Sequence, residues 1–224
     1  MDQVKRQRDA LNVLNQVVRH DIRNDLQLVL GYAQRLSEHV DEGGVETLET
    51  VISSTEEAIE LTTEARELTD VLLAEDAEIG SIRIDEMVEE EVQSARNANP
   101  DASIEYYRPE TDPTVTGDQM FSSVIRNLVN NAIRHNDAET PKVVVSVTET
   151  GNSVLLSVAD NGPGIPDKRK EDIFESGSSG DDSQGTGIGL FLVSTIVDRY
   201  GGEVNVEDSE FDGAEFKVRL PLAE

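Results

Sequence analysis

The sequence predicts an α+β protein in which a long helical hairpin precedes a sandwich of helices and strands. In the first 79 residues, apolar side chains recur every three or four positions, which is the period of an amphipathic helix. From residue 80 onward, short stretches that alternate apolar and polar residues are interleaved with helical stretches. The pattern changes near residues 75–80, so we expect two domains, 1–79 and 80–224.

The first domain is predicted to be two antiparallel helices. The first helix covers about residues 4–40 and the second about residues 45–72, and Gly43 and Gly44 break the chain between them. A two-helix hairpin buries too little apolar surface by itself. We therefore expect a homodimer in which two hairpins form a four-helix bundle.

The second domain is predicted to be an α/β sandwich with helices on one face of the strands. Strands are expected over residues 82–84, 103–107, 114–116, 142–148, 153–159, 204–207 and 214–220. One helix is expected from a cap at Asp85 to about Ala98, a second after a cap at Asp118, and a third over residues 188–200. The Ser-, Gly- and Asp-rich segment 175–189 is expected to be mobile.

The chain is strongly acidic, with 46 Asp and Glu against 19 Lys and Arg and a formal charge of −27. Such a charge repels nucleic acids and anionic membranes. Molar salt shortens the Debye length to about 3 Å and removes most of the self-repulsion, so we expect a halophilic, haloarchaeal source. The chain has no cysteine and no apolar run of membrane-spanning length. We expect it to be cytoplasmic, whether alone or as a piece of a larger, membrane-associated sensor.

A candidate nucleophile lies in the first helix. His20 is two residues from both Val18 and Ile22, so it points away from the apolar stripe. Asp21 is adjacent, and Asn24 lies one turn further on the same side. The alternative is an ordinary surface histidine on a coiled coil. His39, near the end of that helix, is expected to be only a helix-end residue.

Polar residues gather on a second helix. Asn127 and Asn131 are four apart and share one face, and amide oxygens suit Mg²⁺ that borrows other ligands from phosphates. Arg134 and His135 follow one turn later, within reach of phosphate oxygens. The alternative is an exposed polar helix face.

Two glycine-rich segments complete the candidate site. In Asp160-Asn161-Gly162-Pro163-Gly164-Ile165-Pro166, the glycines let the backbone approach a flat ring, and Asp160 could accept a hydrogen bond from the amine of adenine. In Gly185-Thr186-Gly187-Ile188-Gly189-Leu190, glycines before a helix expose N–H groups to phosphates. Alone, the first segment could be a simple tight turn. The second is not a dinucleotide fingerprint, and the chain has no GxxxxGK[ST] loop.

In this order and spacing, the three motifs resemble the Asn box and the two glycine boxes of the GHKL ATP-binding fold. With His20-Asp21-Ile22-Arg23-Asn24 upstream, the chain resembles the catalytic core of a two-component sensor histidine kinase from about Gln16 to Leu220. Ile173-Phe174-Glu175 is similar to the phenylalanine box that opens the ATP lid of that family.

This resemblance implies ATP-dependent autophosphorylation of His20 and transfer to an aspartate in the receiver domain of a response regulator. His20 would be the phospho-acceptor, and Asp21 would orient its ring and take up its proton. Asn24 would position water for a phosphatase reaction. Catalysis is thus assigned to His20, Asp21 and Asn24, with ATP and Mg²⁺ as the implied nucleotide and cofactor.

The resemblance also assigns the ATP site. Asn131 would bind Mg²⁺ with support from Asn127, Arg134 would touch phosphates, His135 would line the nucleotide, and Asp160 would hold the adenine. The residues expected to bind ATP are Asn127, Asn131, Arg134, His135, Asp160, Gly162, Gly164, Ile165, Phe174, Gly185, Thr186, Gly187, Ile188, Gly189 and Leu190.

The chain departs from the family pattern in two places. Asp25 stands where the family usually has proline, and the lid, 176–184, has no Lys or Arg. Lys168, Arg169 and Lys170, just before the phenylalanine box, are expected to be a solvated charge cluster.

Three alternatives remain on the sequence alone: a GHKL ATPase, a serine kinase of that fold, and a non-enzymatic dimeric signalling scaffold. The ATPases use a glutamate one turn before the Mg²⁺ asparagine, where this chain has Asn127, which cannot act as a base. A serine kinase would have no need for the helical hairpin.

Overall fold

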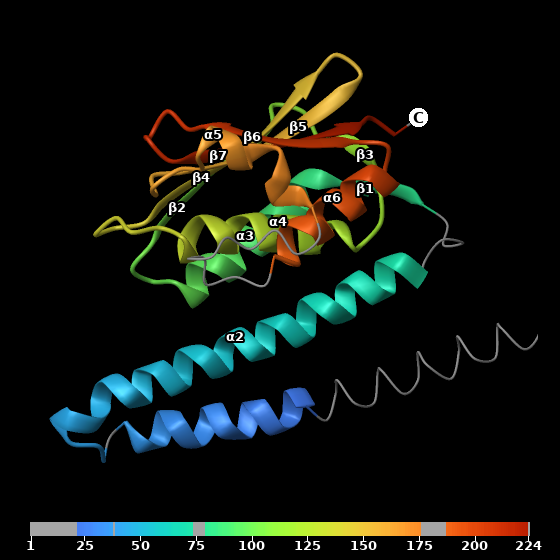
Figure 1. The fold of residues 1–224 in the computed structure, drawn as a ribbon. Coiled ribbons are helices and arrows are strands. Elements are labelled where there is room, and N and C mark those ends of the chain that lie inside the picture. Colours follow the sequence, from blue (N-terminus) through green and yellow to red (C-terminus); the bar gives the residue numbers. More distant parts are fainter. Residues whose placement is uncertain (1–21, 38, 74–78, 176–186, 224) are drawn as a thin grey trace, which may run out of the picture. The chain divides into compact units, whose positions relative to one another are not determined.

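The computed structural model describes residues 22–37, 39–73, 79–175 and 187–223 (Figure 1). The chain divides into two compact units, Met1–Asp70 and Val71–Glu224.

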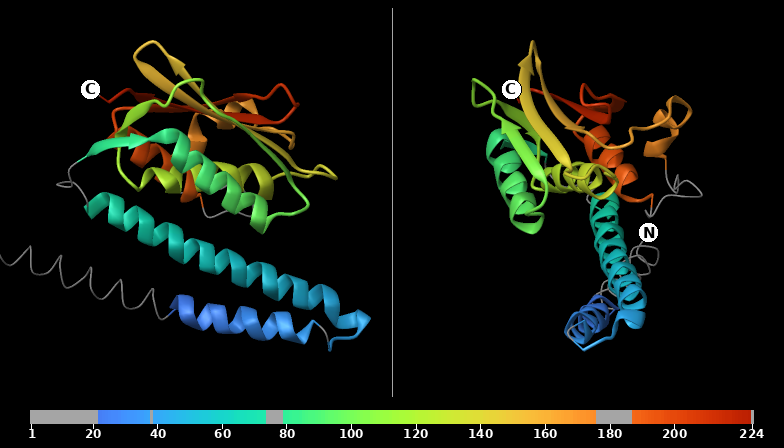
Figure 2. Two further views of the ribbon diagram at one scale, coloured as in Figure 1. Left: turned by 180° about the vertical axis from the view of Figure 1, so that it is seen from behind. Right: turned by 90° about the vertical axis from the view of Figure 1, so that its left-hand side faces the viewer.

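The first unit is a pair of antiparallel helices. A helix over residues 22–36 runs beside α2 (Glu42–Leu73), as the views in Figures 1 and 2 agree. Ala33 on the first helix and Thr55 on α2 are buried. Ile22, Val29 and Leu36, spaced seven residues apart, remain 44%, 47% and 53% exposed. An apolar stripe is therefore left over on the first helix.

The helix boundaries in this unit differ from the prediction. The first helix was expected to reach Val40, but its described part ends at residue 36, and its predicted start lies outside the described residues. The two glycines do not lie between the helices, because α2 begins at Glu42 and includes both. The first turn of a helix lacks intrahelical partners for its N–H groups, so glycine is tolerated there. A Cβ at Gly44 would also collide with the Val40 side chain, so glycine allows the close turn.

The second unit is built on a five-stranded sheet. Its strand order is β2 (Ser103–Tyr107), β4 (Lys142–Thr150), β5 (Ser153–Asp160), β7 (Ala214–Pro221) and β6 (Glu203–Asp208). β2 and β4 are parallel, and the other neighbours are antiparallel. Two further strands, β1 (Gly80–Arg83) and β3 (Thr114–Gly117), form a separate antiparallel pair.

Three helices cover one face of the sheet: α3 (Ile84–Ala98), α4 (Phe121–Arg134) and α6 (Gly189–Arg199) (Figures 1 and 2). Alternate residues of the strands, such as Val145 and Leu156, are fully buried, as are Ile125 and Leu128 of α4. The apolar alternation of the strands thus meets the apolar stripes of the helices. The predicted α+β class and one-faced sandwich are confirmed.

Two predicted helix caps were wrong in detail. Asp85 does not cap α3, because the helix already begins at Ile84. The Asp85 carboxylate instead accepts hydrogen bonds from the Tyr106 hydroxyl at 2.8 Å and from Arg108 at 2.9 Å. These partners, on β2 and directly after it, outweigh a local cap. Asp118 is not the cap of α4 either, because the helix begins at Phe121 and Met120 is its N-cap residue. The Asp118 carboxylate accepts a hydrogen bond from the backbone N–H of Met120 at 2.8 Å, ahead of the first helical turn.

Short helical segments after β5 were not predicted. α5 (Asp167–Lys170) and the 3₁₀ turn η1 (Asp172–Phe174) lie between β5 and residue 176 in sequence. Within the described ranges, no helix combines the length and the apolar character that crossing a bilayer requires.

Candidate functional site

The central carboxylate of the site is Asp160, the last residue of β5. It is only 7% exposed, and its Oδ1 accepts hydrogen bonds from the N–H groups of Gly162 at 2.8 Å and Ala214 at 3.1 Å. Burial raises the pKa of the Asp160 carboxyl, and the two backbone hydrogen bonds oppose that shift. The group is thus held in a defined orientation at the carboxyl end of a central strand.

The glycine segment after Asp160 lies against the end of α4. A Cβ at Gly162 would come within 3.1 Å of the Asp160 carboxylate, 3.3 Å of the His135 carbonyl and 3.4 Å of Asn136 Cα. Gly164 has φ of 69°, a conformation that favours glycine. The structure therefore brings the first glycine motif and the asparagine motif together, with Ile165 half-buried beside them.

A pair of asparagines joins these two motifs. Asn136 Nδ2 donates to Asn161 Oδ1 at 2.9 Å, and the N–H of Lys142 donates to the same oxygen at 2.7 Å. Asn161 Nδ2 donates to the Thr140 carbonyl at 3.3 Å. Neither asparagine had a predicted role. Asn136 follows the end of α4 and Asn161 follows the end of β5, and asparagine at such positions often bonds to the backbone. These positions could have indicated a structural role.

The polar face of α4 carries the amides. Asn127 and Asn131 are half-buried, and Asn127 Nδ2 donates to the Ser123 carbonyl at 2.8 Å. Arg134 and His135 are exposed at the end of the helix, where the His135 N–H donates to the Asn131 carbonyl at 3.1 Å. The opposite side of the helix is buried in the core.

The second glycine motif is described only in part. Gly187 has φ of 66°, Ile188 and Leu190 are half-buried, and Gly189 is the buried first residue of α6. Phe174 of η1 places its ring edge on to Phe216, with centroids 6.3 Å apart. Gly185 and Thr186 lie outside the described residues.

Of the predicted catalytic residues, only Asn24 is described. It is exposed on the helix over residues 22–36. His20 and Asp21 lie outside the described residues, so their assignment stays a prediction.

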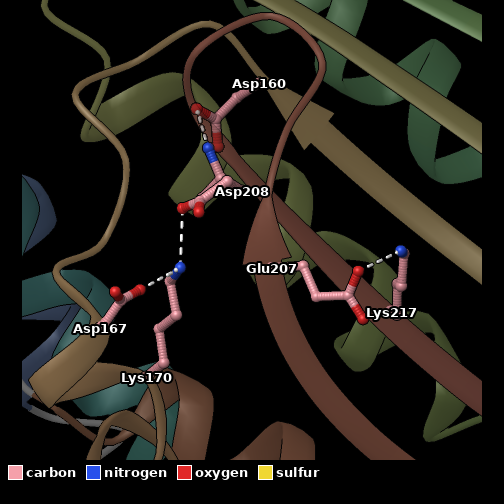
Figure 3. A network of polar contacts seen from close by, with 7 residues as sticks. Asp160, Asp167, Lys170, Glu207, Asp208 and Lys217 are labelled. Atoms are coloured by element: carbon pink, nitrogen blue, oxygen red, sulfur yellow. Dashed lines mark hydrogen bonds and ion pairs between the residues drawn. The ribbon is translucent and has the colours of Figure 1, made fainter.

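The basic cluster before the phenylalanine box is not uniformly solvated. Lys168 and Arg169 are exposed as expected, but the side chain of Lys170 is only 16% exposed. Figure 3 shows its Nζ between the carboxylates of Asp167 and Asp208, each at 2.7 Å. These contacts raise the pKa of Lys170 and fasten α5 to the end of β6. The prediction failed for Lys170 because Asp208 is distant in sequence.

The site offers neutral amides and one buried carboxylate as possible ligand-binding groups. Within the described part of the chain, no group of three or more His, Cys, Asp or Glu side chains could hold a metal ion by itself. A neutral amide such as that of Asn131 is the kind of donor that suits a cation taking its remaining ligands from water and phosphate oxygens. The buried Asp160 carboxylate is chemically able to accept a hydrogen bond from an amine on a ring placed against the glycine segment.

Residues 117–224 match the family described as "Histidine kinase-, DNA gyrase B-, and HSP90-like ATPase". The chain is 31% identical over 211 residues to the probable sensor histidine kinase TcrY of Mycobacterium tuberculosis, covering 91% of this chain and 44% of that protein. It is 30% identical over 228 residues to the sensor histidine kinase ZraS of Escherichia coli O157:H7, covering 99% of this chain and 49% of that protein. The chain thus spans less than half the length of these relatives.

Solved structures of histidine kinases have a similar fold. The catalytic domain of histidine kinase ThkA superposes with a TM-score of 0.58 at 27% identity, covering 64% of this chain and 95% of that one. Full-length ShkA in complex with AMPPNP superposes with a TM-score of 0.66 at 24% identity, covering 94% of this chain and 46% of that one, and supports the fold. Residues 117–224 therefore match the histidine kinase, gyrase B and HSP90-like ATPase family, and these similarities together support a histidine kinase catalytic core with a GHKL ATP-binding domain.

Proposed function

We propose that this chain is the kinase core of a two-component sensor, which phosphorylates its own His20 with ATP and passes the phosphoryl group to an aspartate of a response regulator. The observation that carries the proposal is the buried, oriented carboxylate of Asp160 beside a glycine segment that touches the asparagine helix. Such a carboxylate suits the exocyclic amine of adenine.

The phosphate end of the nucleotide would lie along α4. Arg134 would contact phosphate oxygens, and Asn131, supported by Asn127, would bind the Mg²⁺ that neutralises their charge. His135 would line the nucleotide. Phe174 and the glycines before α6 would shape the lid side.

The identity of residue 127 favours phosphoryl transfer over hydrolysis. An amide cannot take a proton from water, and the Asn127 nitrogen already donates to the Ser123 carbonyl. The γ-phosphate would therefore remain intact until a nucleophile arrives.

The nucleophile would be a ring nitrogen of His20. Asp21 would accept the proton of the other nitrogen, so that the attacking nitrogen offers a lone pair. A nitrogen–phosphorus bond forms, the bond between the γ-phosphorus and the bridging oxygen breaks, and ADP leaves. Positioning supplies most of the rate in such transfers. In a separate phosphatase reaction, Asn24 would position the water that removes the phosphoryl group from the regulator.

We propose that the working unit is a homodimer. Ile22, Val29 and Leu36 form a heptad-spaced stripe that the hairpin leaves exposed, and a second hairpin would cover it in a four-helix bundle.

The decisive experiment is labelling with γ-labelled ATP and Mg²⁺ in molar KCl. We expect an acid-labile label that His20→Gln abolishes and that His39→Gln, the control on the same hairpin, retains. Label that persists in His20→Gln would move the acceptor elsewhere. Phosphate release without labelling would indicate an ATPase, and nucleotide binding with neither would indicate a scaffold.

A further inference from the structure

The turn between β6 and β7, residues 209–213, is built around Asp160. The Ser209 hydroxyl donates to the backbone carbonyl of Asp160 at 2.6 Å, although the two residues are 49 apart in sequence. Ser209 is only 8% exposed, and its oxygen also accepts a hydrogen bond from the N–H of Phe211 at 2.9 Å. The Ser209 hydroxyl thus both donates and accepts a hydrogen bond, and these two bonds hold the turn against the end of β5.

Gly213 lies too close to Asp160 to be any other residue. A Cβ at Gly213 would collide with both the carbonyl oxygen and the carboxylate Oδ1 of Asp160. The collision is with backbone as well as side chain, so no rotamer change can relieve it. A Cβ at Gly164 would likewise come 3.4 Å from the Gly213 carbonyl, so the turn touches the glycine segment too.

The turn is held in this position by its own hydrogen bonds and by Lys142. The Ser209 N–H donates to the Gly213 carbonyl at 2.9 Å, and Asp212 takes up the left-handed φ of 69° that aspartate tolerates. Lys142 Nζ lies 4.3 Å from the centre of the Phe211 ring. The adjoining Lys170–Asp208 ion pair is a weaker brace, because Asp208 is exposed and molar salt screens the pair.

The turn also decides which oxygen of the carboxylate the ligand can use. Ala214, the first residue after the turn, donates its N–H to Asp160 Oδ1 at 3.1 Å, and Gly162 donates to the same oxygen at 2.8 Å. These bonds commit Oδ1 to the protein and fix the direction of the other oxygen.

We propose that Ser209 and Gly213 are positioning residues that set the preference of this site for adenine over guanine. The inference rests on the proposed function, since it takes Asp160 as the base-binding group. Adenine presents an amine donor where guanine presents a carbonyl acceptor. A fixed carboxylate binds the first and repels the second, whereas a carboxylate that can turn discriminates less.

The test is a comparison of ADP and GDP affinity in molar KCl, by calorimetry for ADP and by competition for GDP. We expect Gly213→Ala to raise the Kd for ADP at least about tenfold and Ser209→Ala about threefold to tenfold, while the Kd for GDP is unchanged or falls. The preference for adenine, measured as the Kd for GDP divided by the Kd for ADP, should therefore fall. A general loss of stability would weaken the binding of both nucleotides and would not lower this ratio.

Two matched controls come from sites away from the turn. Ser153 lies at the opposite end of β5 from Asp160, and a Cβ at Gly80 would meet only the Gly117 carbonyl, at 3.9 Å. Ser153→Ala and Gly80→Ala should keep the wild-type ratio.

An unchanged ratio in folded Ser209→Ala and Gly213→Ala would overturn the positioning role and leave the proposed function intact. If Gly213→Ala does not fold, Ser209→Ala decides. If the wild-type protein binds ADP no better than GDP, the assignment of Asp160 to an adenine site is wrong. That outcome contradicts the proposed function and is distinct from a failure of the positioning role.

Discussion

The hydroxyl of Tyr200 donates a hydrogen bond to the carboxylate of Asp118, 82 residues earlier in the chain. The same carboxylate accepts from the Met120 N–H, and it lies 3.5 Å from Arg199. The rings of Tyr200 and Phe121 are also in contact, with centroids 6.5 Å apart. This cluster ties the start of α4 to the end of α6, whereas the proposed nucleotide-binding residues lie in the middle and at the end of α4 and at the start of α6.

Tyr200→Phe should therefore lower stability without changing nucleotide binding. Loss of a hydrogen bond to a partly buried charged group should reduce the free energy of unfolding by about 1.5–3 kcal/mol, measured by urea denaturation. Tyr107→Phe is the control, because Tyr107 is exposed and its hydroxyl donates to the Glu105 carboxylate on the surface. That change should stay within about 0.5 kcal/mol.

The pH dependence of the wild type supplies a second readout for this cluster. Burial, reinforced by the hydrogen bond to Asp118, raises the pKa of Tyr200 above its ordinary value of 10.0. Above pH of about 10 the unfolded tyrosine loses its proton while the folded one keeps it, so stability falls as pH rises. The fall should be shallower in Tyr200→Phe, and an identical slope would contradict the assignment.

Asp160→Asn should weaken ADP binding without unfolding the domain. The amide carbonyl can still accept from Gly162 and Ala214, but the charge facing the base is gone. We expect a loss of about tenfold to hundredfold in affinity, or about 1.4–2.8 kcal/mol. Because burial raises the pKa of Asp160, wild-type affinity should begin to fall at a pH above the ordinary carboxyl value of 3.8, and the variant should lack this step.

Asn131→Ala should remove the magnesium dependence of ATP binding. Affinities measured with Mg²⁺ and with EDTA should converge in the variant and differ in the wild type. Asn130→Ala, at the neighbouring position on α4, is the control and should keep the wild-type difference. A magnesium effect that survives in Asn131→Ala would refute the metal role.

Val29→Glu should convert the dimer into a monomer, because it places a charge in the middle of the exposed apolar stripe. Sedimentation velocity in molar KCl would show the change. Gln27→Glu adds the same charge at an exposed polar position of the same helix and should leave the dimer intact. A wild type that sediments as a monomer would remove the four-helix bundle from the proposal.

Stability should rise with salt. With a formal charge of −27, the folded chain repels itself at low ionic strength, and molar KCl screens that repulsion. The midpoint temperature of thermal unfolding should increase steadily as KCl is raised from ~0.1 M to molar concentration. A flat or falling midpoint would exclude adaptation to high salt.

Local patterns predicted much of the fold, because alternation and helical periodicity are properties of neighbouring residues. The strand at Ser103–Tyr107 and the hairpin of β4 and β5 follow from such patterns. The parallel pairing of β2 with β4 does not, since strand partners are chosen by the whole sheet.

The site divides in the same way. Asp160 and Gly162 were predicted because they lie together in one motif. Ser209, Gly213 and Ala214 were missed, because each meets Asp160 across about 50 residues of chain. The alternating patterns over 204–207 and 214–220 predicted two strands, but nothing local indicated what the turn between them would hold.

The hairpin tip at Gly151 and Asn152 offers an experimental handle. A side chain at Gly151 would meet nothing within 4 Å, and the neighbouring residue Asn152 is exposed. Since the chain has no cysteine, Asn152→Cys would create a unique thiol for a fluorophore. β5 joins this tip to Asp160 over seven residue steps, or about 23 Å, so a dye there could report on nucleotide occupancy without touching the base.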